Sequence, residues 1–199
     1  EEFIMAIDGV KKIGRQSTKR KILSEQPSPN NNFTTPTRKK GDGFAAIAGM
    51  DELKRQMVEE VIKPLREPEE YQRYGITIPN GMLLYGPPGC GKTFFAKHLA
   101  EEVGFNFLCI TPATLKSRYV NATQENIARM FKEAEENAQT IIFIDEINEL
   151  VPCRDGATHE MSKSAVNEML AQMDKTGEKG IFIIGATNYP NAIDPAILR

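Results

Sequence analysis

The residues with the most specific chemistry form the segment Gly86-Pro87-Pro88-Gly89-Cys90-Gly91-Lys92-Thr93, which fits the pattern G-x-x-x-x-G-K-[ST]. Glycines in such a loop let the backbone approach a polyphosphate, so that N–H groups and the start of the following helix face the anion. Lys92 is placed to reach the β- and γ-phosphates, and the Thr93 hydroxyl is placed to bind the bridging Mg²⁺. The spacing therefore predicts a site for a magnesium-bound nucleotide; the alternative is a glycine-rich turn with a purely structural role.

Two adjacent carboxylates, Asp145 and Glu146, follow the apolar run 141–144. Such runs are typical of strands in a parallel sheet that is covered on both faces, and ligands bind at the carboxyl ends of these strands. We therefore expect both carboxylates at the same edge as Lys92, where one can bind Mg²⁺ and the other can polarise a water for attack on the γ-phosphate. The alternative is an acidic strand end that is simply exposed to solvent.

A further apolar run, 181–186, ends on Thr187 and Asn188. An amide at a strand end can hydrogen-bond a γ-phosphate oxygen and the attacking water without adding charge. Asn188 could equally form the turn before Tyr189 and Pro190, so the residues alone leave both roles open.

The elements that must position these side chains follow from the spacing of apolar residues and from the Gly and Pro positions. The strands are predicted at 82–85, 105–110, 141–146 and 181–188, and they indicate an α/β fold with a parallel sheet. The helices are predicted at 50–62, closed by Pro64, and at 67–74, 94–103, 124–137 and 164–173, with a short helix and loop over 112–119. A short apolar stretch at 3–7 has no partner that the sequence identifies.

The chain has 199 residues, 40% hydrophobic and 26% charged, which is ordinary for a soluble globular domain. Residues 1–42 are predicted to be an N-terminal segment and flexible basic linker, because Glu25 is the only acid in the polar, Lys- and Arg-rich stretch 11–40. Residues 43–199 are predicted to be the nucleotide-binding domain. A basic arm could contact nucleic acid, acidic protein tails or anionic lipid, but a solvated linker is favoured because aromatic residues are not interleaved with the charges.

The three cysteines, Cys90, Cys109 and Cys153, are widely spaced and form no C-x-x-C pair, which argues against a disulfide framework and a zinc site. A reducing, cytoplasmic compartment is therefore expected. No stretch approaches the ~20 apolar residues of a membrane span. Because the sequence opens on Glu1 and stops at Arg199 in a run that looks like the start of another element, we expect a fragment of a longer protein.

Two histidine patterns are set aside as functional sites. The stretch His159-Glu160-Met161-Ser162-Lys163 begins like the zinc-protease motif, but Lys163 stands where a second histidine would have to bind zinc. His98 has no second titrating partner nearby in sequence and is expected to be a partly exposed helix residue.

Taken together, these segments resemble the AAA+ ATPases, and within them the AAA subgroup that includes protein unfoldases and microtubule-severing enzymes. The resemblance covers about 44–199 and rests on four motifs in the family's order. They are 86–93 as Walker A, 141–146 as Walker B, 186–188 as sensor 1, and the stretch 193–199. The resemblance implies a P-loop NTPase, a three-layer αβα sandwich with strand order 5-1-4-3-2, in which the strands found here are 1 to 4. Strand 5 and the helical lid are expected beyond Arg199.

The resemblance also implies ATP and Mg²⁺ as cofactors and gives each site residue a role. Thr93 and Asp145 hold the metal, Glu146 activates water, and Lys92 and Asn188 act on the γ-phosphate. The implied nucleotide contacts are Ile47, Ala48 and Gly49, which line the adenine pocket through their backbone, and Pro87, Pro88, Gly89, Cys90, Gly91, Lys92, Thr93, Phe94, Asp145 and Asn188.

Members of this family usually work as ring hexamers that pull a polypeptide through a central pore with an aromatic loop. The matching positions here are Tyr119 and Val120, and a flat aromatic suits a grip that demands no particular sequence. The stretch 121–124, Asn-Ala-Thr-Gln, departs from the family's common Gly-Glu-Ser-Glu. Cys90 replaces the usual Thr or Ser of the phosphate loop, and a thiol there could make the site sensitive to oxidation.

We therefore expect an ATP-hydrolysing protein remodeller that acts as a homo-hexamer on a protein substrate. The alternative is a nucleotide-dependent switch or scaffold that binds partners without threading them, and the altered stretch 121–124 keeps it open. A DNA-loading or DNA-unwinding member is disfavoured by the acidic body. The arginine fingers and the sensor 2 residue are expected beyond Arg199, so this chain is expected to bind ATP weakly and to hydrolyse it slowly. Because strand 5 is also expected beyond Arg199, the chain is expected to expose the edge of strand 82–85 and therefore to aggregate.

Overall fold

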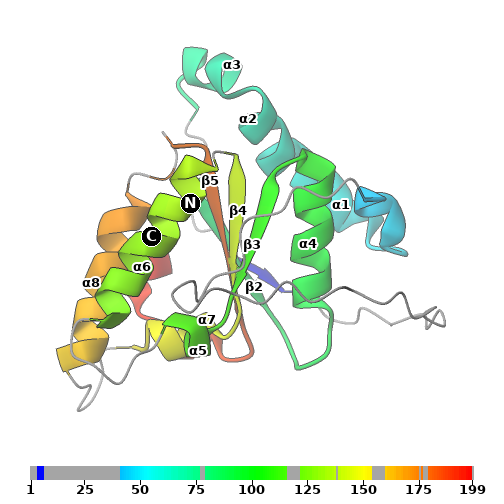
Figure 1. Cartoon of the computed structure of the whole chain (residues 1–199). Helices are drawn as coiled ribbons and strands as arrows, with labels where there is room; N and C mark the ends of the chain where they lie inside the picture. Colours follow the sequence, from blue (N-terminus) through cyan, green and yellow to red (C-terminus); the bar gives the residue numbers. More distant parts are fainter. Residues whose placement is uncertain are drawn as a thin grey trace, which may run out of the picture.

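The computed structural model describes residues 4–6, 41–76, 79–115, 122–137, 139–153, 160–174, 176 and 179–198. In this part of the chain a parallel sheet lies between two layers of helices (Figure 1). One face of the sheet packs against α6 (Ala122–Glu136) and α8 (Glu160–Met173), and the other packs against α1 (Asp51–Met57) and α4 (Lys92–Val103). The predicted α/β fold, a three-layer αβα sandwich, is confirmed.

The strands of the described residues are β1 (Ile4–Ala6), β2 (Gly81–Tyr85), β3 (Asn106–Ile110), β4 (Thr140–Ile144) and β5 (Ile181–Thr187). Their order in the sheet is β1-β2-β5-β4-β3, and every pairing is parallel. The four predicted strands therefore stand in the order that the resemblance implied. β4 and β5 are buried along their whole length, as strands covered on both faces must be.

The prediction of an exposed edge at strand 82–85 is wrong. β1 pairs in parallel with that edge, with Ile4 opposite Leu83 and Ala6 opposite Tyr85. The apolar stretch near the N-terminus thereby finds its partner, because the backbone N–H and C=O groups of an edge strand can pair with a further strand. The aggregation was expected because this edge would be unpaired, and the pairing with β1 removes that reason.

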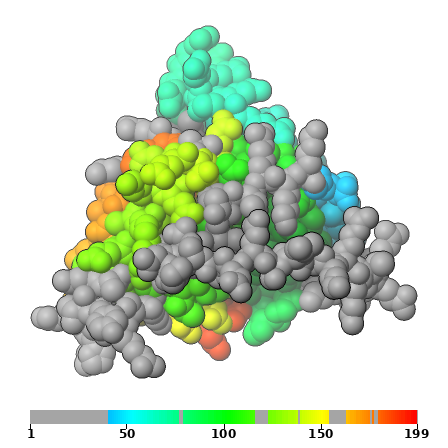
Figure 2. All heavy atoms as spheres, viewed as in Figure 1, coloured from blue at the N-terminus to red at the C-terminus, as the bar shows by residue number. Residues whose placement is uncertain are grey.

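The predicted end of the first long helix at Pro64 is also wrong. A π-helical turn, η2 (Val58–Ile62), continues α1 and leads directly into α2 (Lys63–Arg66). Pro64 lies in the first turn of α2, and the π turn before it, in which the N–H of Lys63 donates to Val58 O, accommodates the missing backbone N–H. α2 and the following α3 (Pro68–Arg73) project from the body of the molecule (Figures 1 and 2).

Helix α4 is held against the sheet by the apolar stripe that its sequence predicts. Phe95, Leu99 and Val103 are buried in the same cluster as the strand residue Phe143. The 3-10 turn η1 (Gly43–Ala46) packs on this helix, and the rings of Phe44 and Phe95 stack with their centroids 5.8 Å apart. The start of α4, which is the end of the phosphate loop, is therefore fixed by the core.

Short helices connect the remaining elements: α5 (Pro112–Leu115), α7 (Ile147–Leu150), η4 (Pro190–Ala192) and η5 (Pro195–Leu198). None of the helices in the described residues has both the length and the apolar character needed to cross a bilayer.

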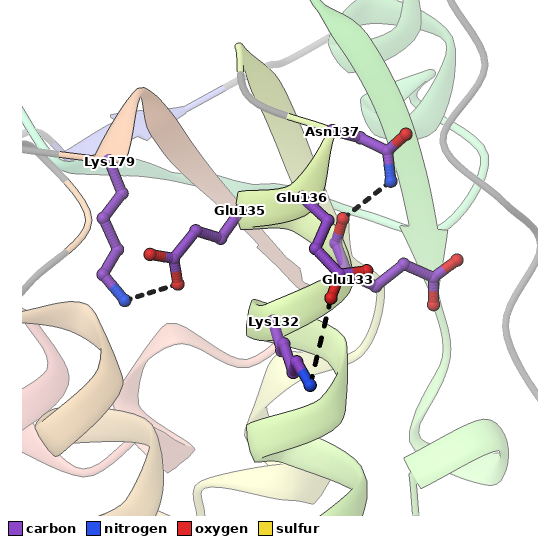
Figure 3. A network of polar contacts seen from close by, with 6 residues as sticks. All are labelled: Lys132, Glu133, Glu135, Glu136, Asn137 and Lys179. Atoms are coloured by element: carbon purple, nitrogen blue, oxygen red, sulfur yellow. Dashed lines mark hydrogen bonds and ion pairs between the residues drawn. The ribbon is translucent and has the colours of Figure 1, made fainter.

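The amino ends of the strands meet a set of polar residues that we call the amino rim, formed by Asn106, Glu135, Asn137, Thr140 and Lys179. The backbone C=O of Asn137 accepts hydrogen bonds from Asn106 Nδ2 at 2.9 Å and from Thr140 Oγ1 at 2.6 Å. Lys179 Nζ pairs with Glu135 Oε2 at 2.6 Å (Figure 3). These contacts join the end of α6 to the starts of three strands.

Candidate active site

The carboxyl ends of β2, β5 and β4 bring the predicted site residues to the opposite edge of the sheet. Tyr85 is paired with Thr187, and Ile144 with Gly185, so the three strands end at nearly the same level. We call the residues that follow these ends the carboxyl rim. It consists of the loop 86–91, Lys92, Thr93, Asp145, Glu146, Thr187 and Asn188.

The loop 86–91 has the backbone that a phosphate cradle requires. Gly89 and Gly91 have φ of 78° and 97°, in the left-handed region that favours glycine. Gly91 is also the N-cap of the twelve-residue helix α4, and no side chain caps that helix end. Pro87, Pro88 and Gly89 are exposed, and a Cβ at Gly89 would meet no atom within 4 Å. The loop and the helix start therefore present N–H groups to an open side, which fits an anionic ligand.

Lys92 is buried at the centre of the rim, with 8% of its surface exposed. Its Nζ donates to Gly86 O at 2.9 Å, to Pro87 O at 3.2 Å and to Asn188 Oδ1 at 2.8 Å. Cys90 Sγ lies 3.7 Å from the same nitrogen. The fold thus brings together Lys92 and Asn188, which the sequence singled out separately, 96 residues apart.

Asp145 and Glu146 lie in different surroundings although they are adjacent. The Asp145 side chain is half-buried, and its Oδ1 accepts the backbone N–H of Glu146 at 3.0 Å. Glu146 is exposed and has a left-handed backbone, with φ 50° and ψ 43°, at the N-cap of α7. A left-handed non-glycine residue is uncommon and often occurs at functional sites. Two carboxylates in unlike environments are suited to two different roles.

Asn148 is a residue of this region that sequence reasoning missed. Thr187 Oγ1 donates to Asn148 Oδ1 at 2.6 Å and accepts the backbone N–H of Tyr189 at 2.9 Å. These bonds tie the end of β5 to α7, the helix that begins after Glu146. A polar residue two positions after Glu146 was the available signal, but the sequence could not identify its partner.

The oxygen donors at the carboxyl rim suit Mg²⁺. Within the described residues there is no group of three or more His, Cys, Asp or Glu side chains that could hold a metal by themselves. Mg²⁺ does not need such a group, because it usually takes one or two protein oxygens and completes its shell with water and phosphate. The Thr93 hydroxyl in the exposed first turn of α4 and the Asp145 carboxylate are oxygen donors of that kind.

The predicted adenine segment lies beside α4 but is partly engaged in the protein. Ile47 is buried, its N–H donates to Phe44 O at 3.2 Å, and its C=O accepts a hydrogen bond from Lys54 Nζ. Ala48 and Gly49 are exposed. An adenine amino group that binds the C=O of Ile47 would therefore share this oxygen with Lys54. The prediction for Ile47, Ala48 and Gly49 stays a prediction.

Phe94 and His98 lie on the same side of α4. Phe94 is 43% exposed, and its ring meets that of His98 edge-on, with the centroids 4.3 Å apart. His98 Nδ1 lies 2.7 Å from Glu101 Oε2, so the prediction that it has no titrating partner nearby is wrong. Residues three apart on a helix share a face, which explains the pair. His98 is partly exposed, as predicted, and lies outside the carboxyl rim.

Cys109 is affected by the charge of the rim. Partial burial of its sulfur raises the pKa of the thiol, and the negative charge of Asp145 raises the pKa further. The predicted pore residues Tyr119 and Val120 lie outside the described residues, as does His159 of the rejected zinc motif.

Known proteins match this chain over most of its length. The model of the AAA family, the ATPase family associated with various cellular activities, matches residues 82–199. Protein SAV of Sulfolobus acidocaldarius is 46% identical over 154 residues, which is 77% of this chain and 20% of that protein. The ribosome biogenesis ATPase RIX7 of Saccharomyces cerevisiae is 41% identical over 173 residues, 82% of this chain and 20% of the relative.

A cell division cycle protein 48 homolog of Archaeoglobus fulgidus is 46% identical over 157 residues, 78% of this chain and 21% of that protein. The chain therefore spans about a fifth of the length of the curated relatives that it matches.

Proposed function

The chain belongs to the AAA family of ATPases, and on that premise we propose that it binds and hydrolyses Mg-ATP as part of a motor subunit that threads a protein through a hexamer pore. The main support for a nucleotide site is that the carboxyl rim has charged side chains without ion-pair partners. Lys92, Asp145 and Glu146 have no ion-pair partner among the described residues. A buried charge without an ion-pair partner, as at Lys92, is costly unless a ligand of opposite charge completes it.

Each residue of the rim has a role in this proposal. The N–H groups of the loop and the Lys92 ammonium bind the phosphates, while Thr93 and Asp145 hold Mg²⁺. The metal would neutralise charge on the phosphates. Glu146 orients and polarises the attacking water, and its exposed position is compatible with access to bulk water. Asn188 contacts the γ-phosphate through its amide.

The unlike surroundings of the two carboxylates support this division of roles. Asp145 is held by the N–H of Glu146 at 3.0 Å, so its oxygens have a fixed direction, as a metal ligand requires. Glu146 extends from a left-handed N-cap into solvent, where it can exchange a proton. A metal ligand benefits from rigidity, whereas a general base needs access to water and substrate.

The assembly and the substrate are proposals from the family. We propose a homo-hexamer, a protein substrate and a cytoplasmic location, with Tyr119 and Val120 as the gripping positions and adenine bound at 47–49. The hexamer is inferred from membership of the AAA family, in which ring hexamers are usual. The stretch 121–124 favours one alternative, a nucleotide-dependent switch or scaffold that binds partners without threading, because it lacks two acids that the family commonly has.

Glu146→Gln in the full-length protein tests the proposed chemistry. The amide cannot act as a base, so we expect ATP hydrolysis to fall by about 10²- to 10⁴-fold while ATP binding persists. The matched control is Glu136→Gln, an exposed glutamate at the far end of α6. Hydrolysis measured by phosphate release should be unchanged in the control. A Glu146→Gln variant that hydrolyses ATP at the wild-type rate would remove Glu146 from this role.

A further inference from the structure

The Lys92 ammonium has as many oxygen acceptors around it as it has N–H donors. Two acceptors are backbone carbonyls of its own loop, those of Gly86 and Pro87, and the third is Asn188 Oδ1 at 2.8 Å. Since an ammonium group carries three donors, its hydrogen-bonding capacity is met by the protein. A phosphate that binds Lys92 must therefore compete with these acceptors.

The contact also fixes the orientation of the Asn188 amide. Lysine can only donate, so the oxygen of the amide has to face Nζ and the NH₂ group has to face away. Asn188 can then offer an incoming phosphate oxygen a donor, but it offers Lys92 an acceptor at the same time. The two halves of this side chain have opposite effects on phosphate binding.

The backbone next to Asn188 is held in place, which limits how far its side chain can follow Lys92. The preceding residue, Thr187, is 1% exposed and bonds to Asn148 and to the N–H of Tyr189. β5 is the inner strand between β2 and β4 and is paired on both sides. If Lys92 moves toward a phosphate, the bond to Asn188 is lost rather than carried along.

We propose that Asn188 is a specificity residue that disfavours ADP relative to ATP by retaining Lys92. This inference rests on the proposed function of the carboxyl rim. A γ-phosphate gives the Asn188 NH₂ group an acceptor and so offsets the lost bond to Lys92, whereas ADP lacks that phosphate and offers no such contact. The Asn188 side chain thus opposes retention of the product and favours the substrate.

The test compares the dissociation constants of Mg-ADP and Mg-AMP-PNP for the wild-type chain and for Asn188→Ala. We expect the variant to bind ADP about 5- to 10-fold more tightly, because the phosphates of ADP no longer compete with the Asn188 oxygen for Lys92. AMP-PNP should bind equally or more weakly, so the preference for the triphosphate falls. Tighter binding after loss of a polar side chain is not expected if Asn188 simply contacts ADP. The matched control is Asn191→Ala, an exposed residue of η4, which should change neither constant.

The same variant has a second readout that needs no nucleotide. The rate of Lys92 acylation, followed by mass spectrometry, should rise several-fold in Asn188→Ala, with the exposed Lys97 of α4 as internal reference. Asn188→Leu, which is similar in volume and has no acceptor, should behave in the same way if the alanine variant fails to fold.

Unchanged Lys92 reactivity, or ADP binding that weakens or stays the same in both variants, would overturn the specificity role while leaving the proposed function in place. A wild-type chain that binds neither nucleotide would overturn the proposed function and the specificity role together.

Discussion

At the amino rim the charged side chains are paired with one another, whereas at the carboxyl rim they are not. Lys179 pairs with Glu135 at 2.6 Å, and next to this rim, on the last turns of α6, Lys132 lies 3.9 Å from Glu136 (Figure 3). Lys92, at the other end of the sheet, has only neutral acceptors. The difference shows that polar residues at a strand end do not by themselves indicate a site, while charges that the protein leaves uncompensated do.

Backbone geometry distinguishes the two rims less well than charge does. Gln139, which precedes Thr140 of the amino rim, has a φ of 65°, and Glu146 at the carboxyl rim has a φ of 50°. The Gln139 conformation has a structural reason, because its C=O accepts the N–H of Asn106 at 2.8 Å. A left-handed residue therefore indicates function only when its side chain adds a charge that has no partner in the described residues, as at Glu146.

The largest expected contrast between the rims comes from Lys92→Ala. Removing the central cation of the carboxyl rim should raise the dissociation constant for Mg-ADP by about 100-fold, since contacts between an ammonium and phosphate are among the stronger hydrogen bonds. Lys97→Ala, one turn further along α4 and exposed, is the control and should leave the constant unchanged. Isothermal titration measures both. Equal affinities for wild type and Lys92→Ala would contradict the assignment of nucleotide binding to the carboxyl rim.

At the amino rim, Thr140→Val is expected to have a smaller effect, and to change the stability of the fold rather than the affinity for nucleotide. The fully buried Thr140 hydroxyl donates to Asn137 O at 2.6 Å, and valine keeps the shape of the side chain without the donor. We expect the free energy of unfolding to fall by about 1 kcal/mol and nucleotide affinity to stay the same. Urea unfolding and titration with Mg-ADP test the two halves of this prediction. A change in affinity with no change in stability would reverse the assignment of the rims.

The smallest expected effect concerns how the alkylation rate of Cys109 depends on pH. Burial and the Asp145 charge raise the pKa of its thiol above the ordinary value of 9.0, so the reactive thiolate forms only at higher pH than in an unperturbed cysteine. Alkylation of Cys109 at pH 8 should therefore be slow, and its midpoint should lie above pH 9. Asp145→Asn should lower the midpoint only in part, because burial is the larger cause. A midpoint below 9 in the wild type would show that burial and the Asp145 charge do not control the ionisation of this thiol.

The parts of the molecule that the sequence predicts are those in which local pattern and tertiary structure agree. The phosphate loop, the strand that ends before Asp145 and the buried stripe of α4 could be predicted because a motif or a period is visible in neighbouring residues. The sequence could predict that Lys92 and Asn188 lie at the same edge of the sheet, but it could not predict the hydrogen bond between them. The order of the strands decides which strand ends are neighbours.

Other features depend on contacts between distant segments. The pairing of β1 with β2 requires knowledge of which edge is available, and the sequence near Ile4 carries no sign of it. Helix continuity through Pro64 depends on the π turn before it, which changes the register of the backbone bonds. The role of Asn148 depends on Thr187, 39 residues away, so no local signal identifies it.

Hydrogen–deuterium exchange of the chain with and without Mg-AMP-PNP tests most directly whether the nucleotide binds at the carboxyl rim. If it does, exchange becomes slower in peptides that cover 86–95, 145–148 and 187–189, and stays unchanged in peptides that cover 133–140 and 179–181. Protection that is confined to the amino rim, or a saturating nucleotide that leaves 86–95 unprotected, would contradict binding at the carboxyl rim.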